Sequence, residues 1–153
     1  MIIAQNVTKN FDGTAVIKDV SARFDKGITN LIIGQSGSGK TVLMKCLVGL
    51  HEVDEGSVFF DDENFTRMNW KQRKTLRQEV GMLFQGGALF DSLSVEQNVM
   101  FPLDLYWESP YEEKLERVNF CLEKVGLEGI NNKMPGELSG GMVKRVAIAR
   151  AIA

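Results

Sequence analysis

One run of eight residues limits the possible folds more than any other feature of the sequence. Residues 34–41 read Gly-Gln-Ser-Gly-Ser-Gly-Lys-Thr, which matches the pattern G-x-x-x-x-G-K-[ST]. The apolar run 28–33 before it predicts a short buried strand, and residues 41–50 after it predict an amphipathic helix. A strand, a glycine-rich loop and a helix in this order form a cradle for phosphate groups. We therefore expect an α/β core with a phosphate site at the start of this helix.

The residue types in this loop explain how it would bind a nucleotide. Its glycines let the backbone come close enough for N–H groups to face phosphate oxygens. Lys40 would reach the β- and γ-phosphates, and the Thr41 hydroxyl would bind Mg²⁺. The candidate nucleotide-binding residues of the loop are Gly34, Ser36, Gly37, Ser38, Gly39, Lys40 and Thr41.

The loop alone does not distinguish kinases, GTPases and ATPases. Residues 132–134, Asn-Lys-Met, begin like the N-K-x-D motif with which GTPases read guanine. Pro135 stands where that motif requires an aspartate, so we discount a GTPase of this kind.

A second glycine-rich motif lies about a hundred residues further on. Residues 138–142, Leu-Ser-Gly-Gly-Met, begin a predicted helix with Ser139 as its N-cap. The two glycines leave backbone N–H groups open at a positive helix end, which favours a second anion site. The alternative is a capped helix with a glycine-rich start. One nucleotide does not need two phosphate cradles on one chain, so the phosphate loop alone does not explain the second cradle.

Together the two motifs resemble the ATP-binding-cassette (ABC) ATPase family over the whole chain. The phosphate loop is similar to the family's Walker A motif, and residues 138–142 are similar to its signature motif, with Met142 where glutamine is usual. Gln85, after the predicted strand 80–84, resembles the Q-loop glutamine, a catalytic residue and second Mg²⁺ contact. Phe11 resembles the aromatic residue that stacks on adenine.

The resemblance implies an ATPase that uses ATP and Mg²⁺, with Lys40 and Gln85 in catalysis. It also implies a head-to-tail dimer in which Ser139, Gly140 and Gly141 bind the ATP of a second ABC subunit. The family's Walker B aspartate, catalytic glutamate, D-loop and switch histidine follow the signature helix, in which this sequence ends. We therefore expect a truncated, inactive cassette that leaves sheet edges and apolar surface uncovered.

Residues 81–95 and 137–145 resemble more closely the ATPases of Mce-type lipid transporters, including the Mla phospholipid system. This resemblance implies lipid transport across the bacterial envelope, with a transmembrane permease and an Mce-domain lipid-binding protein as partners. Three alternatives stay open: an ABC ATPase for an amino acid or a drug, a non-transport ABC protein acting on DNA or ribosomes, and a binding-only fragment without turnover. The short insert between Gln85 and Leu138 argues against the second.

Composition restricts the partners and the compartment. The net charge of −2 provides no basic field for nucleic acid. Cys46 and Cys121 lie in predicted helices as small apolar residues, and His51 is the only histidine, so no metal or disulfide framework is expected. The N-terminus does not resemble a signal peptide and no run approaches the ~20 apolar residues of a membrane span. We expect a cytoplasmic protein, peripheral on the inner face of the membrane.

The remaining patterns predict a β subdomain and ATP-binding core at 1–87, a helical subdomain at 88–138 and the signature helix at 139–153. Strands are expected at 2–8, 15–24 and 57–61, and a basic helix at 68–77. Ser94 and Ser109 each begin a capping box, so helices should follow them. Residues 86–105 carry apolar side chains that either dock a membrane subunit or form the helical core: Leu89, Phe90, Leu93, Val99 and Phe101.

Overall fold

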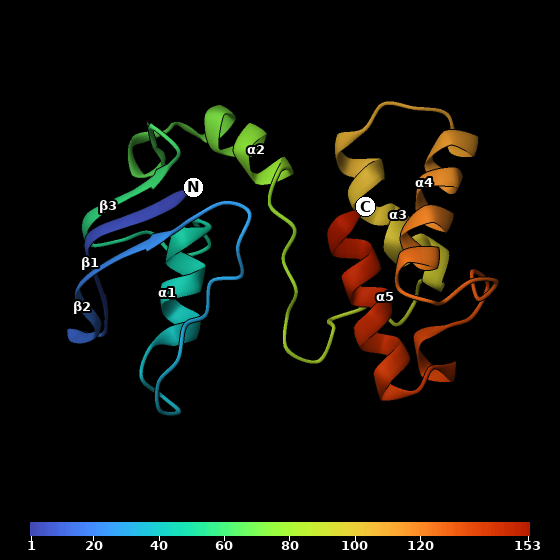
Figure 1. Cartoon of the computed structure of the whole chain (residues 1–153), viewed down its shortest axis with the longest axis horizontal. Coiled ribbons are helices and arrows are strands. Elements are labelled where there is room, and N and C mark those ends of the chain that lie inside the picture. Colours follow the sequence, from blue (N-terminus) through green and yellow to red (C-terminus); the bar gives the residue numbers. More distant parts are fainter. The chain divides into compact units, whose positions relative to one another are not determined.

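The computed structural model describes all 153 residues, which form two compact units, Met1–Arg77 and Gln78–Ala153 (Figure 1). Each unit has a hydrophobic core of its own. The boundary expected at residue 87 falls inside the second unit, and the signature helix packs there with the helical subdomain. The division into three segments stays a prediction about the whole cassette.

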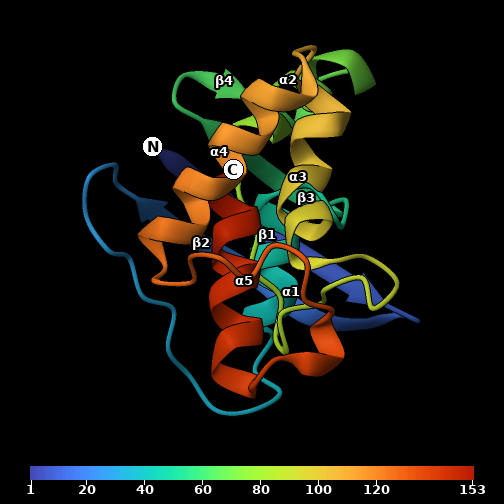
Figure 2. The same cartoon turned by 90° about the vertical axis from the view of Figure 1, so that its right-hand side faces the viewer.

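The first unit is built on a four-stranded antiparallel sheet in the order β2-β1-β3-β4. Its strands are β1 (Ile2–Phe11), β2 (Thr14–Phe24), β3 (Glu55–Phe60) and β4 (Glu63–Asn64). Helix α1 (Lys40–Leu47) packs against β1 and β2, and it lies beside these strands in both views (Figures 1 and 2). The 3₁₀ helix η1 (Phe65–Arg67) and helix α2 (Trp70–Gln78) follow the sheet. Three of the four strands predicted in this unit, at 2–8, 15–24 and 57–61, are confirmed, as are both of its predicted helices, except that α1 ends at Leu47 rather than residue 50.

A bulge in β1 decides which residues reach the core. Ala4 and Val7 are both buried although they are three residues apart, which strict alternation along a strand does not allow. Their partners on β2, Ala22 and Val20, are only two residues apart, so β1 carries one extra residue between them. Asn6 lies in this bulge and has a positive φ of 50°. The core of the unit consists of Ala4, Val7, Ile17, Leu43, Cys46, Leu47, Val58 and Phe65.

Two predicted strands do not form, and the α/β core is therefore incomplete. Residues 28–33 are irregular, with Ile28, Leu31 and Ile33 exposed by 65%, 80% and 81%. Residues 80–84 are also irregular, and Phe84 is 42% exposed. An apolar run becomes a strand only when a neighbour satisfies its backbone N–H and C=O groups, and no strand pairs with either run. The expectation of uncovered apolar surface is confirmed, whereas the prediction of strands was wrong for these segments.

The second unit is helical. Helices α3 (Val95–Tyr106), α4 (Tyr111–Lys124) and α5 (Gly140–Ile152) pack against one another (Figure 2), and the 3₁₀ helix η2 (Pro135–Glu137) precedes α5. The predicted apolar face of α5 is confirmed, since Val146 and Ala149 are fully buried. The core of the unit consists of Val95, Val99, Met100, Leu103, Val118, Cys121, Leu122, Leu127, Val146 and Ala149.

One of the two predicted capping boxes forms. The Ser94 hydroxyl accepts a hydrogen bond from the Gln97 N–H at 3.2 Å, and the Gln97 side chain accepts one from the Ser94 N–H at 2.8 Å. The box predicted at Ser109 was wrong. Pro110 itself occupies the N-cap of α4, so Ser109 lies one residue too early and its hydroxyl donates to Glu113 instead, at 2.8 Å.

Candidate nucleotide site

The phosphate loop adopts backbone conformations that require glycine. Gly37 and Gly39 have φ angles of 80° and 86°, in the left-handed region. Gly39 is also the N-cap of α1, and a Cβ there would lie 2.8 Å from the carbonyl oxygen of Val16. The φ angles therefore account for glycine at both positions, and the close packing of the loop on β2 adds a second reason at Gly39.

The Lys40 ammonium lies inside the loop. Its Nζ donates hydrogen bonds to the carbonyl oxygens of Gly34 at 2.9 Å and Gln35 at 2.6 Å. The Ser38 N–H also donates to the Gln35 oxygen, at 3.2 Å, which closes the turn. Lys40 is the first residue of α1, so its charge adds to the positive end of the helix. Phosphate oxygens are stronger acceptors than these neutral carbonyls, so a polyphosphate can replace them as partners of Lys40.

The rest of the predicted loop is open to solvent. Ser36 and Thr41 are exposed, and Thr41 occupies the second position of α1. A pocket of about 290 Å³ adjoins the loop, with Ser38, Gly39 and Lys40 on one side. This size lies near the lower end of ligand pockets. On the other side it is lined by β2 and by the irregular run before the loop: Val16, Ile17, Lys18, Val20, Ile32 and Ile33. The sequence pattern of β2 offered no signal that Val16 and Lys18 face this pocket.

Phe11 lies at the surface and not in the core. Its side chain is 39% exposed, at the last position of β1. The Lys9 ammonium lies 5.4 Å from the ring centroid. The ring of His51 meets it edge-on, with centroids 5.4 Å apart and an interplanar angle of 77°. An exposed aromatic ring of this kind can stack on a base, whereas sequence reasoning found neither Lys9 nor His51 beside it.

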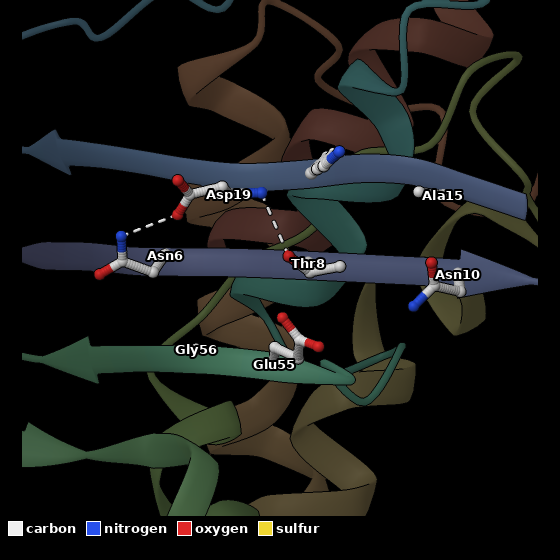
Figure 3. A pocket seen from close by; sticks show the side chains of 8 residues that line it. Asn6, Thr8, Asn10, Ala15, Asp19, Glu55 and Gly56 are labelled. Atoms are coloured by element: carbon white, nitrogen blue, oxygen red, sulfur yellow. Dashed lines mark hydrogen bonds between the residues drawn. The ribbon is translucent and has the colours of Figure 1, made fainter.

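A second pocket, of about 400 Å³, lies on the polar face of the sheet (Figure 3). The Asn6 side chain donates to Asp19 at 2.8 Å, and the Asp19 N–H donates to the Thr8 hydroxyl at 3.1 Å. These bonds join β1 to β2 on the face that carries Asn10 and Glu55. The polar side chains here therefore hold the hairpin together.

The signature motif begins α5 as predicted. Ser139 is the N-cap, and its hydroxyl accepts a hydrogen bond from the Met142 N–H at 3.3 Å. Gly140 and Gly141 are exposed, and a Cβ on Gly140 would touch nothing in the chain. A Cβ on Gly141 would approach only the Ser139 hydroxyl, at 4.0 Å. Packing within this chain does not require glycine at either position.

Gln85 lies in an exposed turn of the second unit. The Gly87 N–H donates to the Phe84 carbonyl at 3.0 Å, and Gly86 and Gly87 both have positive φ angles. The predicted site residues thus fall into two groups. Phe11 and the phosphate loop belong to the first unit, whereas Gln85 and the signature motif belong to the second. The Mg²⁺ contact predicted for Gln85 and Thr41 together stays a prediction.

The apolar residues of segment 86–105 divide between core and surface. Val99 is fully buried and Leu89 packs against the helical core, so for these two the core alternative holds. Phe90 and Phe101 are 42% and 38% exposed. Their ring centroids lie 4.8 Å apart, and they form an exposed aromatic pair.

Both cysteines lie in helices, as predicted: Cys46 in α1 and Cys121 in α4. Cys46 and Cys121 are free and buried, and burial raises the pKa of both thiols above the ordinary value. No helix has both the length and the apolar character that a membrane span requires.

The comparisons decide the family. Residues 17–153 match the sequence profile of the ABC transporter family. The chain belongs to this family. The structure is similar to the dimeric ATP-binding cassette MJ0796 bound to ADP and Pi, with a TM-score of 0.90 and 32% identity. That match covers 100% of this chain and 69% of the solved one. ATP with Mg²⁺ is the cofactor of the family's cassettes.

Relatives with different transport roles are similar to this ABC chain. The methionine import ATP-binding protein MetN of Clostridioides difficile (strain 630) is 44% identical over the whole chain, which covers 47% of MetN. The intermembrane phospholipid transport system ATP-binding protein MlaF of Escherichia coli (strain K12) is 41% identical over 138 residues, which are 90% of this chain and 51% of MlaF. The chain thus spans about half the length of these curated relatives.

Proposed function

We propose that the chain is the nucleotide-binding part of an ATPase that drives membrane transport. The observation that carries this proposal is the position of Lys40, whose ammonium lies inside a glycine loop at the start of α1. A loop of N–H donors with one fixed ammonium suits the triphosphate of ATP, because charge and donors are already in place. Thr41, next in the helix, would supply the hydroxyl for Mg²⁺.

The other predicted residues complete the nucleotide site in this proposal. Phe11 stacks on adenine from the end of β1, since its ring is exposed beside the same sheet. Gln85 binds Mg²⁺ and the attacking water. Residues 139–141 bind the γ-phosphate held by a second ABC subunit, which accounts for two glycines that packing within the chain does not need. The dimeric state of the similar cassette MJ0796 supports this arrangement.

Coupling to transport needs a permease, and the exposed aromatic pair Phe90 and Phe101 is our candidate contact. Aromatic side chains are enriched at protein interfaces and depleted on free surfaces. The pair follows Gln85 in the sequence, so a permease that binds there can act on the catalytic glutamine. In such a complex the chain lies on the inner face of the cytoplasmic membrane.

For the transported substrate we propose a lipid, in a system of the Mce or Mla type with an Mce-domain protein as a further partner. The stretch 81–95 and the similarity to MlaF at 41% identity support this proposal. Methionine is the second candidate, because MetN is 44% identical over the whole chain. Affinity purification from the native membrane would separate the two, since recovery of an Mce-domain protein supports lipids and recovery of an amino-acid permease overturns the lipid proposal.

Titration calorimetry with ATP and Mg²⁺ tests nucleotide binding by the chain itself. We expect Lys40→Ala to weaken ATP binding by at least about tenfold, because a charge-assisted contact is worth roughly 1.5–3 kcal/mol. Lys45→Ala is the matched control, since it removes the same charge from the last turn of the same helix. Equal ATP affinities of the two variants would show that the loop is not the phosphate site.

A further inference from the structure

The end of β1 is fixed by a carboxylate that comes from a distant part of the chain. Asp54, just before β3, accepts a hydrogen bond from the Asn10 N–H at 2.5 Å and one from the Lys9 ammonium at 2.9 Å. The Asn10 side chain also donates to Asp54, at 3.3 Å. In return the Asp54 N–H donates to the Thr8 carbonyl at 2.9 Å. One aspartate thus joins the start of β3 to residues 8–10 of β1.

This junction lies next to the exposed ring of Phe11. Asn10, whose place at the end of β1 is seen in Figure 3, is the residue before Phe11. After Phe11 the chain turns through Asp12 and Gly13, with φ angles of 49° and 78°, as in the type I′ turns that join tight hairpins. The ring therefore projects from a backbone held on one side by Asp54 and on the other by the turn.

The same carboxylate also orients the cation beside the ring. Lys9 lies 5.4 Å from the Phe11 centroid, and its ammonium is held by Asp54. The Lys9 side chain is only 14% exposed, so its ammonium has little freedom to leave. His51 restricts the movement of the Phe11 ring from another side through its edge-on contact. Phe11 is thus restrained in backbone and ring orientation while 39% of it stays open to a ligand.

We infer that Asp54 is a positioning residue for nucleobase binding: it holds the Phe11 ring in place as a stacking platform. This inference rests on the proposed function, because it takes the base of ATP as the ligand of Phe11. A ring that is fixed before binding loses less conformational entropy when a base stacks on it. Asp54 would therefore act on affinity for the base and leave affinity for the phosphates unchanged.

The test compares two ligands that share the phosphate loop but differ in the base. ATP and inorganic tripolyphosphate are titrated into the 153-residue chain and into Phe11→Ala, Asp54→Ala and Asp54→Asn. Because Phe11→Ala removes the ring on which the base would stack, we expect its ATP affinity to fall about tenfold. For Asp54→Ala we expect a loss of about three- to tenfold by the same argument, with tripolyphosphate affinity unchanged in both variants.

The conservative variant Asp54→Asn and one further variant, Asp61→Ala, make the test specific. Asp54→Asn keeps an acceptor for the Asn10 N–H, so it should retain most of the ATP affinity. Asp61→Ala is the matched control, because Asp61 is an exposed aspartate paired with the N-terminal ammonium and with Lys26 beyond the other end of β3. It should bind ATP like the parent chain.

The outcomes separate the inference from the proposed function. Suppose that the parent chain binds both ATP and tripolyphosphate, and that Asp54→Ala binds ATP with unchanged affinity. This result overturns the role of Asp54 but not the proposed function. An equal loss for both ligands in Asp54→Ala overturns this role as well, because general damage to the fold would do the same. If the parent chain binds neither ligand, the proposed function itself fails and the inference falls with it.

Discussion

The guanidinium of Arg150, on α5, donates a hydrogen bond to the carbonyl oxygen of Gly87 at 2.8 Å. A second bond reaches the Ala88 oxygen at 2.9 Å, and the guanidinium lies 5.8 Å from the centre of the Phe90 ring. A Cβ on Gly87 would lie 3.0 Å from the Val143 side chain, so the loop packs directly on α5. The loop that follows Gln85 is therefore attached to the helix that begins with the signature motif.

Loss of the Arg150 side chain should loosen this loop. We expect Arg150→Ala to lower the free energy of unfolding by roughly 1–3 kcal/mol, because two carbonyl oxygens lose a charged donor. Hydrogen exchange at residues 86–90 should become faster at the same time. Arg150→Lys should recover only part of the effect, since lysine does not reproduce the planar pair of donors. Lys144→Ala, an exposed change on the same helix, is the control, and equal exchange rates in the two alanine variants would contradict the role of Arg150.

Acid should weaken the junction between β1 and β3. The Asn10 N–H, followed by the Lys9 ammonium, holds the pKa of Asp54 below its ordinary value. A carboxylate with a lowered folded-state pKa contributes stability above its unfolded-state pKa, and this contribution is lost as the pH falls through the folded-state value. The unfolding midpoint in urea should therefore decrease below about pH 4, and the decrease should be smaller in Asp54→Asn. If the unfolding midpoint of Asp54→Asn depends on pH in the same way as that of the parent, Asp54 does not cause the loss of stability in acid.

The 153-residue chain should bind ATP without turning it over. The chain covers 69% of the similar cassette MJ0796, and we expect the carboxylates that bind Mg²⁺ and activate water to lie in the part of a cassette that it does not cover. Phosphate release with and without Mg²⁺ measures this directly. Mg²⁺-dependent turnover in the parent chain that disappears in Lys40→Ala would show that the chain carries its own general base.

In a cassette completed beyond residue 153, nucleotide should drive dimerisation through the signature motif. Gly141→Asp places a bulky, negatively charged side chain at an exposed position that we propose to face the second nucleotide. We expect ATP binding to stay within about twofold of the parent, whereas ATP-dependent dimers disappear, since a like charge opposes the γ-phosphate. Sedimentation with and without ATP reports the dimer. Dimers that still form, or nucleotide affinity lost in the monomer, would refute a role in trans.

Segment 86–105 should contact the permease through its exposed residues. Photocrosslinkers at Ala88 and Ser92, which are both exposed, should label a permease loop in membranes that contain the whole transporter. Glu123, exposed on α4, is the control position and should not label it. Labelling from Glu123 but not from Ala88 or Ser92 would place the interface elsewhere.

Local sequence patterns were sufficient to predict the features that depend on a few neighbouring residues. The glycine-rich loop that leads into α1, the capping box at Ser94 and the N-cap at Ser139 are all present as predicted. Each depends on backbone conformations and hydrogen bonds within a few positions, which the order of residue types specifies. The same holds for the apolar face of α5, whose helical period is visible in the sequence.

Only the tertiary structure decided which apolar runs become strands and which side chains surround Phe11. Residues 28–33 and 57–61 are both apolar in sequence, yet only the second run finds a partner, in β1. Pairing depends on a distant segment, which a local pattern does not contain. Asp54 and His51 likewise reach the end of β1 from forty or more positions further along the chain, at distances set by the register of β1 and β3. The sequence by itself therefore determined the family and the position of the glycine-rich loop, whereas the sheet determined the surroundings of Phe11.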